Sequence, residues 1–161
     1  MDHLKHAEAT MSLLDLLHLG AKPPVPSPVD ELIQWDQTLS VGNPMIDNEH
    51  REIIHVLNRF YADWITAGHH LDVEEELHHL SALVDTHFAN EEELMTRRHC
   101  PSLTDHIQDH RQMQAELRAI TASFTTLGSA KLEARLLRFI RKLVMGHVLS
   151  WDMDARDYLR A

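Results

Sequence analysis

The sequence predicts an all-α fold, an antiparallel up-down-up-down four-helix bundle with an extra N-terminal helix. The 161 residues are dominated by Leu, Ala, Glu, His and Arg, which suit helices, and include only 5 Gly. Four stretches repeat apolar residues at the three-and-four spacing of an amphipathic helix. The turns between these stretches are short, which makes consecutive helices antiparallel neighbours.

The chain divides into two parts, with a helix and linker over residues 1–29 and the bundle over residues 30–161. The N-terminal helix covers residues 1–20 and can end at Gly20. A stiff, polyproline-like linker follows, Lys22-Pro23-Pro24-Val25-Pro26-Ser27-Pro28. This helix either packs on the surface of its own domain or docks on a partner protein or a second copy. Its apolar residues are Leu4, Met11, Leu13, Leu14, Leu16 and Leu17.

The bundle begins with an extended lead segment that contains Trp35 and ends at Gly42-Asn43-Pro44. We expect Asp47 to cap the first helix, which runs to about Ala67 and is ended by Gly68. The core-facing stripe of this helix consists of His50, Ile53, Ile54, Leu57, Phe60, Tyr61 and Trp64.

The second and third helices are delimited by capping residues. Asp72 and Glu75 form a capping box for a second helix that runs to about Arg98. After the break at Cys100-Pro101, Ser102 opens the third helix. The stripe of the second helix is Leu77, Leu80, Val84, His87, Glu91, Leu94 and Met95, and that of the third is Leu103, His106, His110, Met113, Leu117, Ile120, Phe124 and Leu127.

The fourth helix begins at Ser129, after Gly128, and completes a pattern that a simple core does not explain. Its stripe is Leu132, Leu136, Phe139, Ile140, Leu143 and His147. Five histidines and one glutamate therefore lie in otherwise apolar stripes. Burying unpaired polar groups costs about 2–7 kcal/mol each. A bound metal is the simplest partner for all six.

Topology brings these six residues to one end of the bundle. His87 with Glu91, and His106 with His110, are pairs four residues apart, so each pair points from one face of its helix. His50 lies at the start of the first helix and, because neighbours are antiparallel, at the level where the fourth helix ends. That end carries the last of the five histidines, His147.

The donor set indicates two transition-metal ions. Nitrogen-rich sites with a carboxylate suit iron, zinc, copper or nickel rather than magnesium or calcium. Two ions need a second bridging carboxylate, and Asp152 is the candidate. In a regular α-helix it would lie about 140° around the axis from His147, five residues earlier. The helix must therefore loosen towards a π-turn, or end, between these two residues.

Four motifs follow one another between residue 35 and about residue 158. They are Trp35…Val41-Gly42…Ile46-Asp47-Asn48-Glu49-His50, then His87-Phe88-Ala89-Asn90-Glu91-Glu92…Met95, then Pro101…His106…His110, and finally His147…Asp152. In order and spacing they resemble the motifs of hemerythrins, especially the bacterial ones.

This resemblance implies a non-haem di-iron centre as the cofactor. Glu91, Asp152 and an oxo or hydroxo oxygen would bridge the two iron ions. One iron would take His106, His110 and His147, and the other would take His50 and His87 and keep an open position for O2. Leu143 stands where the family usually has an aromatic residue, and Leu143, Val144 and Val148 would form the wall of the O2 pocket.

The function implied is reversible O2 binding by an oxygen carrier, store or sensor, without any protein residue acting as catalytic acid or base. Five neutral imidazoles with only two carboxylates favour the ferrous pair, and therefore O2 binding over oxygenation. Two alternatives stay open. Leu143 could widen the pocket for an enzyme that turns over peroxide or nitric oxide, unless Trp151 fills that space. A sensor could also signal through residues 1–20.

Composition excludes several other classes. A formal net charge of -10 argues against nucleic-acid and anionic-membrane binding. The partners that remain are O2, which the resemblance implies, and a protein partner or a second copy at residues 1–20. The single Cys100 excludes an intrachain disulfide. No apolar run approaches the roughly 20 residues of a membrane span, and the acidic start does not suit a signal peptide. We therefore expect a soluble, cytoplasmic protein.

Overall fold

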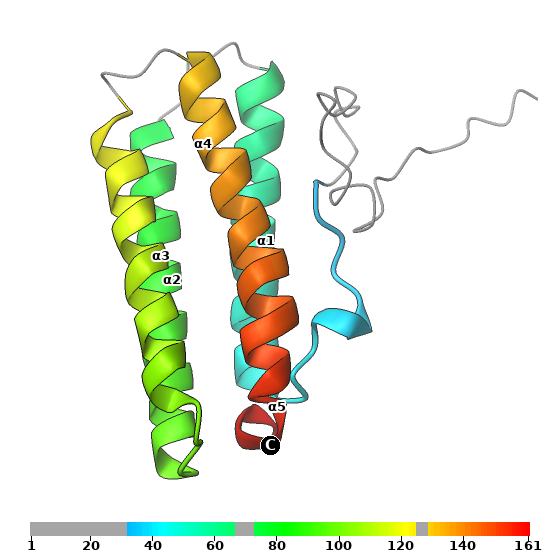
Figure 1. Cartoon of the computed structure of the whole chain (residues 1–161). Coiled ribbons are helices and arrows are strands. Elements are labelled where there is room, and N and C mark those ends of the chain that lie inside the picture. The colour runs from blue at the N-terminus through cyan, green and yellow to red at the C-terminus, as the bar shows by residue number, and fades with distance from the viewer. Residues whose placement is uncertain (1–31, 67–72, 125–128) are drawn as a thin grey trace, which may run out of the picture.

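A computed structural model describes residues 32–66, 73–124 and 129–161 of the chain, and these residues form helices and turns without any strand. This confirms the all-α class for the described part. The helices are η2 (Gln37–Leu39), α1 (Pro44–Thr66), α2 (Val73–Arg97), α3 (Leu103–Ala122), α4 (Ser129–Arg141), η3 (Lys142–Asp152) and α5 (Arg156–Leu159). Figure 1 shows the four long helices α1 to α4 side by side, with η3 continuing α4. The N-terminal helix, the proline linker, Gly68, Asp72, Leu127 and Gly128 lie outside the described residues.

The start of α1 differs from the expectation in its capping residue. The helix begins at Pro44, whose fixed φ and missing N–H suit the first helical position. The side chain of Asn43 accepts a hydrogen bond from the Met45 N–H at 3.0 Å and is therefore the cap. Asp47 lies inside the first turn instead. Its carboxylate accepts hydrogen bonds from the Val41 N–H at 2.9 Å and the Ser40 hydroxyl at 2.7 Å, which fastens the lead segment to α1.

The turn between α2 and α3 is compact because His99 adopts a left-handed conformation, with φ of 54°. The N–H of Cys100 donates to the carbonyl of Met95 at 2.9 Å, the pattern of a Schellman motif. Pro101 then prevents α2 from continuing. Ser102 is the N-cap of α3, as expected, although its side chain makes no capping hydrogen bond.

Helix η3 is a π-helix that covers the whole stretch from Lys142 to Asp152. Hydrogen bonds from residue i to i+5 bring residues five apart nearly into line along the axis. His147 and Asp152 are both fully buried on the inner side of this segment. The expected loosening towards a π-turn is therefore confirmed.

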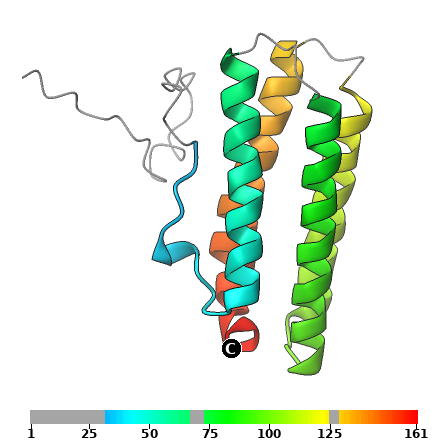
Figure 2. The same ribbon diagram turned by 180° about the vertical axis from the view of Figure 1, so that it is seen from behind.

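Two apolar clusters lie above and below the histidines. The large cluster fills the bundle between the four long helices and includes Leu57, Leu80, Phe88, Leu117 and Phe139. A small cluster closes the end where α5 lies, and it contains Val41, Ile46, Met95, Cys100, Ala155 and Leu159. Figure 2 shows α5 at this end of the bundle, opposite the end of α1 and the start of α2. No helix within the described ranges is long and apolar enough to cross a membrane.

Candidate metal centre

The structure brings the seven predicted site residues together between the two apolar clusters. All seven side chains are buried, with exposed fractions of 2% or less. Helix α1 supplies His50, α2 supplies His87 and Glu91, and α3 supplies His106 and His110. The π-helix η3 supplies the remaining two residues, His147 and Asp152.

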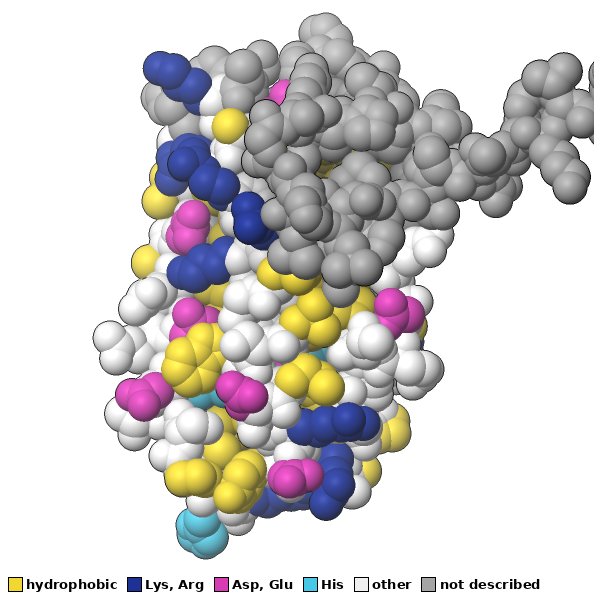
Figure 3. Space-filling view, turned by 45° about the vertical axis from the view of Figure 1, so that its right-hand side comes forward, with side chains coloured by type: hydrophobic (Ala, Val, Ile, Leu, Met, Phe, Trp, Pro, Cys, Tyr) yellow, Lys and Arg dark blue, Asp and Glu magenta, His cyan; other side chains and the backbone are white. Residues whose placement is uncertain are grey.

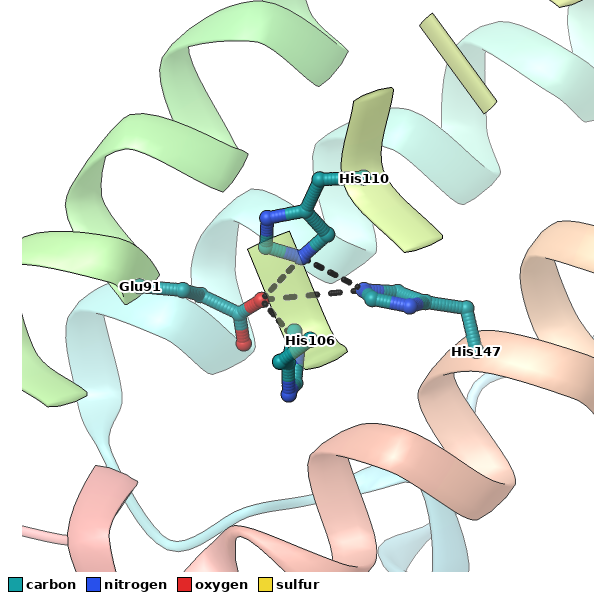
Figure 4. A group of neighbouring side chains, drawn as sticks. All are labelled: Glu91, His106, His110 and His147. Atoms are coloured by element: carbon teal, nitrogen blue, oxygen red, sulfur yellow. Dashed lines mark hydrogen bonds and ion pairs between the residues drawn. The ribbon is translucent and has the colours of Figure 1, made fainter. Parts of the chain in front are cut away.

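Donor atoms of these residues form two overlapping groups. Glu91, His106, His110 and His147 make one group, and His50, His87, Glu91 and Asp152 make the other. Within each group the donor atoms lie within 4.8 Å of one another, a spacing that one metal ion can bridge. Figure 4 shows the first group, in which three imidazoles from α3 and η3 point towards the carboxylate of Glu91.

Both carboxylates lie between the two groups of imidazoles. Oε2 of Glu91 is 3.4 Å from Nε2 of His110 and 3.6 Å from Nε2 of His87. Oδ1 of Asp152 is 3.1 Å from Nε2 of His147, whereas Oδ2 of the same carboxylate is 3.4 Å from Nε2 of His50. Asp152 therefore presents one oxygen to each side.

Five of the donor atoms lack the hydrogen-bond partners that buried polar atoms normally have. Among the described residues, both oxygens of Glu91, both oxygens of Asp152 and Nε2 of His106 are buried without a hydrogen-bond partner. A buried unsatisfied polar group costs about 1–3 kcal/mol, and a charged one costs more. The arrangement fits a pair of metal ions, which would satisfy these atoms together.

The histidines and carboxylates of the cluster shift one another's pKa values. Burial opposes ionisation of Glu91, but the surrounding imidazoles outweigh it and hold the pKa of this carboxyl well below its ordinary value. The pKa of Asp152 is lowered in the same way, against burial and the charge of Glu91. Burial likewise disfavours the charged form of His147, yet Asp152, Asp109 and Glu91 raise its pKa to about 10. Each of these three shifts favours the charged form of its group.

Three further carboxylates, which were not predicted from the sequence, orient the histidines from the side that faces away from the cluster. Each lies within hydrogen-bond distance of the Nδ1 atom of one histidine, so that Nε2 faces the cluster. The pairs are Glu49 with His87 at 3.1 Å, Glu92 with His110 at 2.9 Å, and Asp109 with His147 at 2.9 Å. Such outer carboxylates fix the tautomer and the ring direction of metal-binding histidines.

Each outer carboxylate belongs to the helix that precedes its histidine in the chain. Glu49 lies on α1, Glu92 on α2 and Asp109 on α3, and all three are next to a predicted site residue in the sequence. That adjacency is the only signal in the sequence. It does not reveal the partner, because each carboxylate contacts a histidine of another helix.

An apolar pocket lies beside His50 and His87. It measures about 300 Å³, counting its open side, and it is lined by those two histidines with Leu39, Ile53, Ile54, Leu143, Val144 and Val148. The three wall residues expected from the sequence therefore do line a pocket, and Leu39 of the lead segment is an addition. Trp151 does not fill it, contrary to one expectation. Its ring packs against His106, with the centroids 5.9 Å apart, on the other side of the cluster.

Comparisons with known proteins agree with this geometry. Residues 41–156 match the family described as the hemerythrin HHE cation binding domain. Myohemerythrin-1 of Phascolopsis gouldii is 29% identical over 134 residues, which cover 83% of this chain and all of that protein. Hemerythrin-like proteins of Naegleria gruberi and Naegleria fowleri are each 24% identical over 135 residues, or 84% of this chain and 97% of theirs.

Proposed function

This chain belongs to the hemerythrin family, and on that premise we propose that it holds two iron ions and binds O2 reversibly at them. The observation that supports this most directly is the position of Glu91 and Asp152, whose unpaired oxygens lie between two groups of imidazoles. The donors favour iron over magnesium or calcium, since five are imidazole nitrogens.

The seven site residues divide between the two ions as the family resemblance implies. His106, His110 and His147 would hold one iron, His50 and His87 would hold the other, and Glu91 and Asp152 would bridge them. The antiparallel up-down-up-down bundle accounts for this set, because it brings the start of α1, the end of α2, the start of α3 and the end of α4 to one level. The side-by-side helices of Figure 1 support that arrangement. We assign residues 30–161 to this bundle and residues 1–29 to an N-terminal extension.

The protein holds the ligands in place and keeps water out. When bound, the iron pair would supply the electrons that O2 takes up and returns. Glu49, Glu92 and Asp109 accept hydrogen bonds from the outer nitrogens of three histidines, which leaves the inner nitrogens free for metal. The pocket walls beside His50 and His87 are apolar, so they admit O2 and offer water no hydrogen bonds.

Anaerobic reconstitution with ferrous iron tests this proposal. We expect about two irons per chain, and an optical charge-transfer band that appears under O2 and vanishes under argon over repeated cycles. A band that decays at once to a stable diferric spectrum would contradict reversible binding. Failure to take up iron would contradict the whole proposal.

A second candidate is an enzyme that turns over peroxide or nitric oxide at the same irons. The aliphatic Leu143 favours it, because this residue lines the pocket beside His50 where the family usually has an aromatic ring. We expect Leu143→Phe to narrow the pocket and slow decay of the O2-dependent band, at a cost of about 1–3 kcal/mol in stability. Leu149→Phe, outside the pocket, is the control. Steady-state consumption of peroxide or nitric oxide by the unmodified protein would favour the enzyme.

A further inference from the structure

The contact between α1 and the α4–η3 segment, which we call the α1–α4 seam, is more open than the other helix contacts. The backbone of α1 lies close along α2, and α2 lies close along α3, but α1 and α4 approach each other much less. The lead segment fills the half of the seam near the metal centre. There Leu39 is fully buried and lines the pocket with Ile53 and Val144.

The far half of the seam contains a second apolar groove. It measures about 220 Å³, counting its open side. Helix α1 contributes Tyr61 and helix α4 contributes Leu137, which is only partly buried. The complete lining is Phe60, Tyr61, Leu132, Glu133, Leu136 and Leu137.

The chain reaches the described region next to this groove. The N–H of Ile33 donates to the side chain of Asn58 at 2.8 Å, and that side chain donates back to the Ile33 carbonyl at 2.7 Å. Tyr61 lies three residues beyond Asn58, or about 4.5 Å further along the axis of α1. The described chain therefore begins, at Leu32, near the point where the lead segment stops filling the seam.

We propose that residues 4–17 dock within the same molecule on the far half of the α1–α4 seam, with their leucines over the groove lined by Tyr61 and Leu137. As a helix, residues 4–17 would be about 21 Å long, enough to cover the part of α4 from Leu132 to Ile140, which is about 12 Å. The intervening residues 18–31 can span up to about 46 Å when extended, so the tether is long enough to reach this position.

The charges of the two segments also support residues 4–17 as the occupant of this groove. Residues 1–20 contain three acidic side chains, Asp2, Glu8 and Asp15, and one basic side chain, Lys5. Residues 129–142 have the opposite balance, with Lys131, Arg135, Arg138, Arg141 and Lys142 against Glu133. Figure 3 shows Lys and Arg side chains gathered along one flank of the upper part of this face. Opposite charges at the rim contribute little affinity but set the orientation of a docked helix.

Docking there would extend an interface that already exists. The lead segment covers the seam beside His50, and residues 4–17 would cover its continuation beside Tyr61. The sequence left open whether this helix packs on its own domain, on a partner or on a second copy. The position of Ile33 on α1, next to the groove, favours the first.

Cross-linking in the full-length chain tests the proposal. In a Cys100→Ala background, we would combine Leu14→Cys with Leu137→Cys and treat the protein with a short bismaleimide. We expect an intrachain link between the two positions, identified by mass spectrometry of the peptides. The matched control combines Leu14→Cys with Ala119→Cys, an exposed position on α3, and should give no such link. A link only between chains, or no link, would overturn the proposal.

A labelling experiment provides a second test that does not need a cross-link. The thiol of Leu137→Cys should react with a bulky maleimide about tenfold more slowly in an otherwise unmodified chain than in one carrying Leu14→Asp. Met45→Cys, at a position 45% exposed near the metal centre, should react equally in both chains. Equal rates at Leu137→Cys would overturn docking. Both tests use metal-free protein, so their failure leaves the proposed function unaffected.

Discussion

At the scale of single residues, Glu91 and Asp152 are central because each lies between two groups of imidazoles. Their carboxyl groups are fully buried, and the neighbouring histidines hold the pKa of both below its ordinary value. A buried carboxylate without a cation is costly. Their positions therefore make sense only with bound cations, either protons on the imidazoles or metal ions.

Replacing Glu91 with Gln should reduce iron binding from about two ions per chain to one or fewer. The amide of Gln carries no negative charge, and an NH2 group replaces one of the two carboxylate oxygens that a bridge requires. Iron per chain after anaerobic reconstitution is the measurement. Glu93→Gln, on the exposed side of the same helix, should still bind two ions. Full occupancy in Glu91→Gln would show that this carboxylate is not a bridge.

Asp109→Asn tests the outer carboxylates. His147 would lose its charged partner at 2.9 Å, and its ring would no longer be held in one tautomer. We expect metal affinity to fall by about 10–100-fold, measured by competition with a chelator. Asp105→Asn, one turn earlier on the exposed side of α3, should leave the affinity unchanged. An equal loss in both variants would mean that the effect is general electrostatics.

At the scale of elements, the π-helix η3 decides whether the fourth helix can supply two site residues. In a regular α-helix, Asp152 would lie about 140° from His147. The π register brings both residues to the inner side. It also places Leu143 and Val148 on the wall of the apolar pocket beside His50 and His87. One irregular element therefore serves both the metal centre and the pocket.

Inserting one alanine after Ser150 should abolish binding of one of the two iron ions. The inserted residue would move Asp152 one position further around η3, out of line with His147, so both side chains could no longer face the cluster. Iron content and far-ultraviolet circular dichroism together provide the measurement. An alanine inserted after Arg160, beyond both residues, is the control. Two irons in the first variant would show that the register of η3 is not needed.

At the scale of the whole molecule, the metal centre lies between two apolar clusters that different parts of the chain complete. The lead segment supplies Val41 and α5 supplies Leu159 to the small cluster, which closes the end of the bundle. The end of the lead segment is tied to α5, since the side chain of Asn43 donates to the Leu159 carbonyl at 2.7 Å. Metal binding and stability of the bundle should therefore be coupled.

Removing iron should lower the stability of the whole bundle, because its core would then retain a cluster of buried charges. With free metal at a thousand times the dissociation constant, the stabilisation is about 4 kcal/mol. Thermal unfolding of iron-loaded and chelator-treated protein measures it. Glu91→Gln should show a smaller difference. Identical unfolding temperatures with and without iron would contradict the coupling.

Much of the site could be predicted because it depends on local periodicity. Spacings of four residues on regular helices place His87 with Glu91, and His106 with His110, on one face whatever surrounds them. The need for a π-turn between His147 and Asp152 followed from the same geometry. The assignment of Asp47 as a cap was wrong, because Asn43 takes that place and Asp47 bonds to the lead segment.

The helices, their inward faces and the seven residues that meet at one end could be predicted from the sequence, because backbone geometry relates neighbours along a helix. Packing between helices specifies which carboxylate orients which histidine, that Leu39 lines the pocket and that Trp151 packs on His106. These contacts depend on the rotation and axial shift of one helix against another. Packing of the whole core sets this rotation and shift, and the spacing of residues within one helix does not predict them.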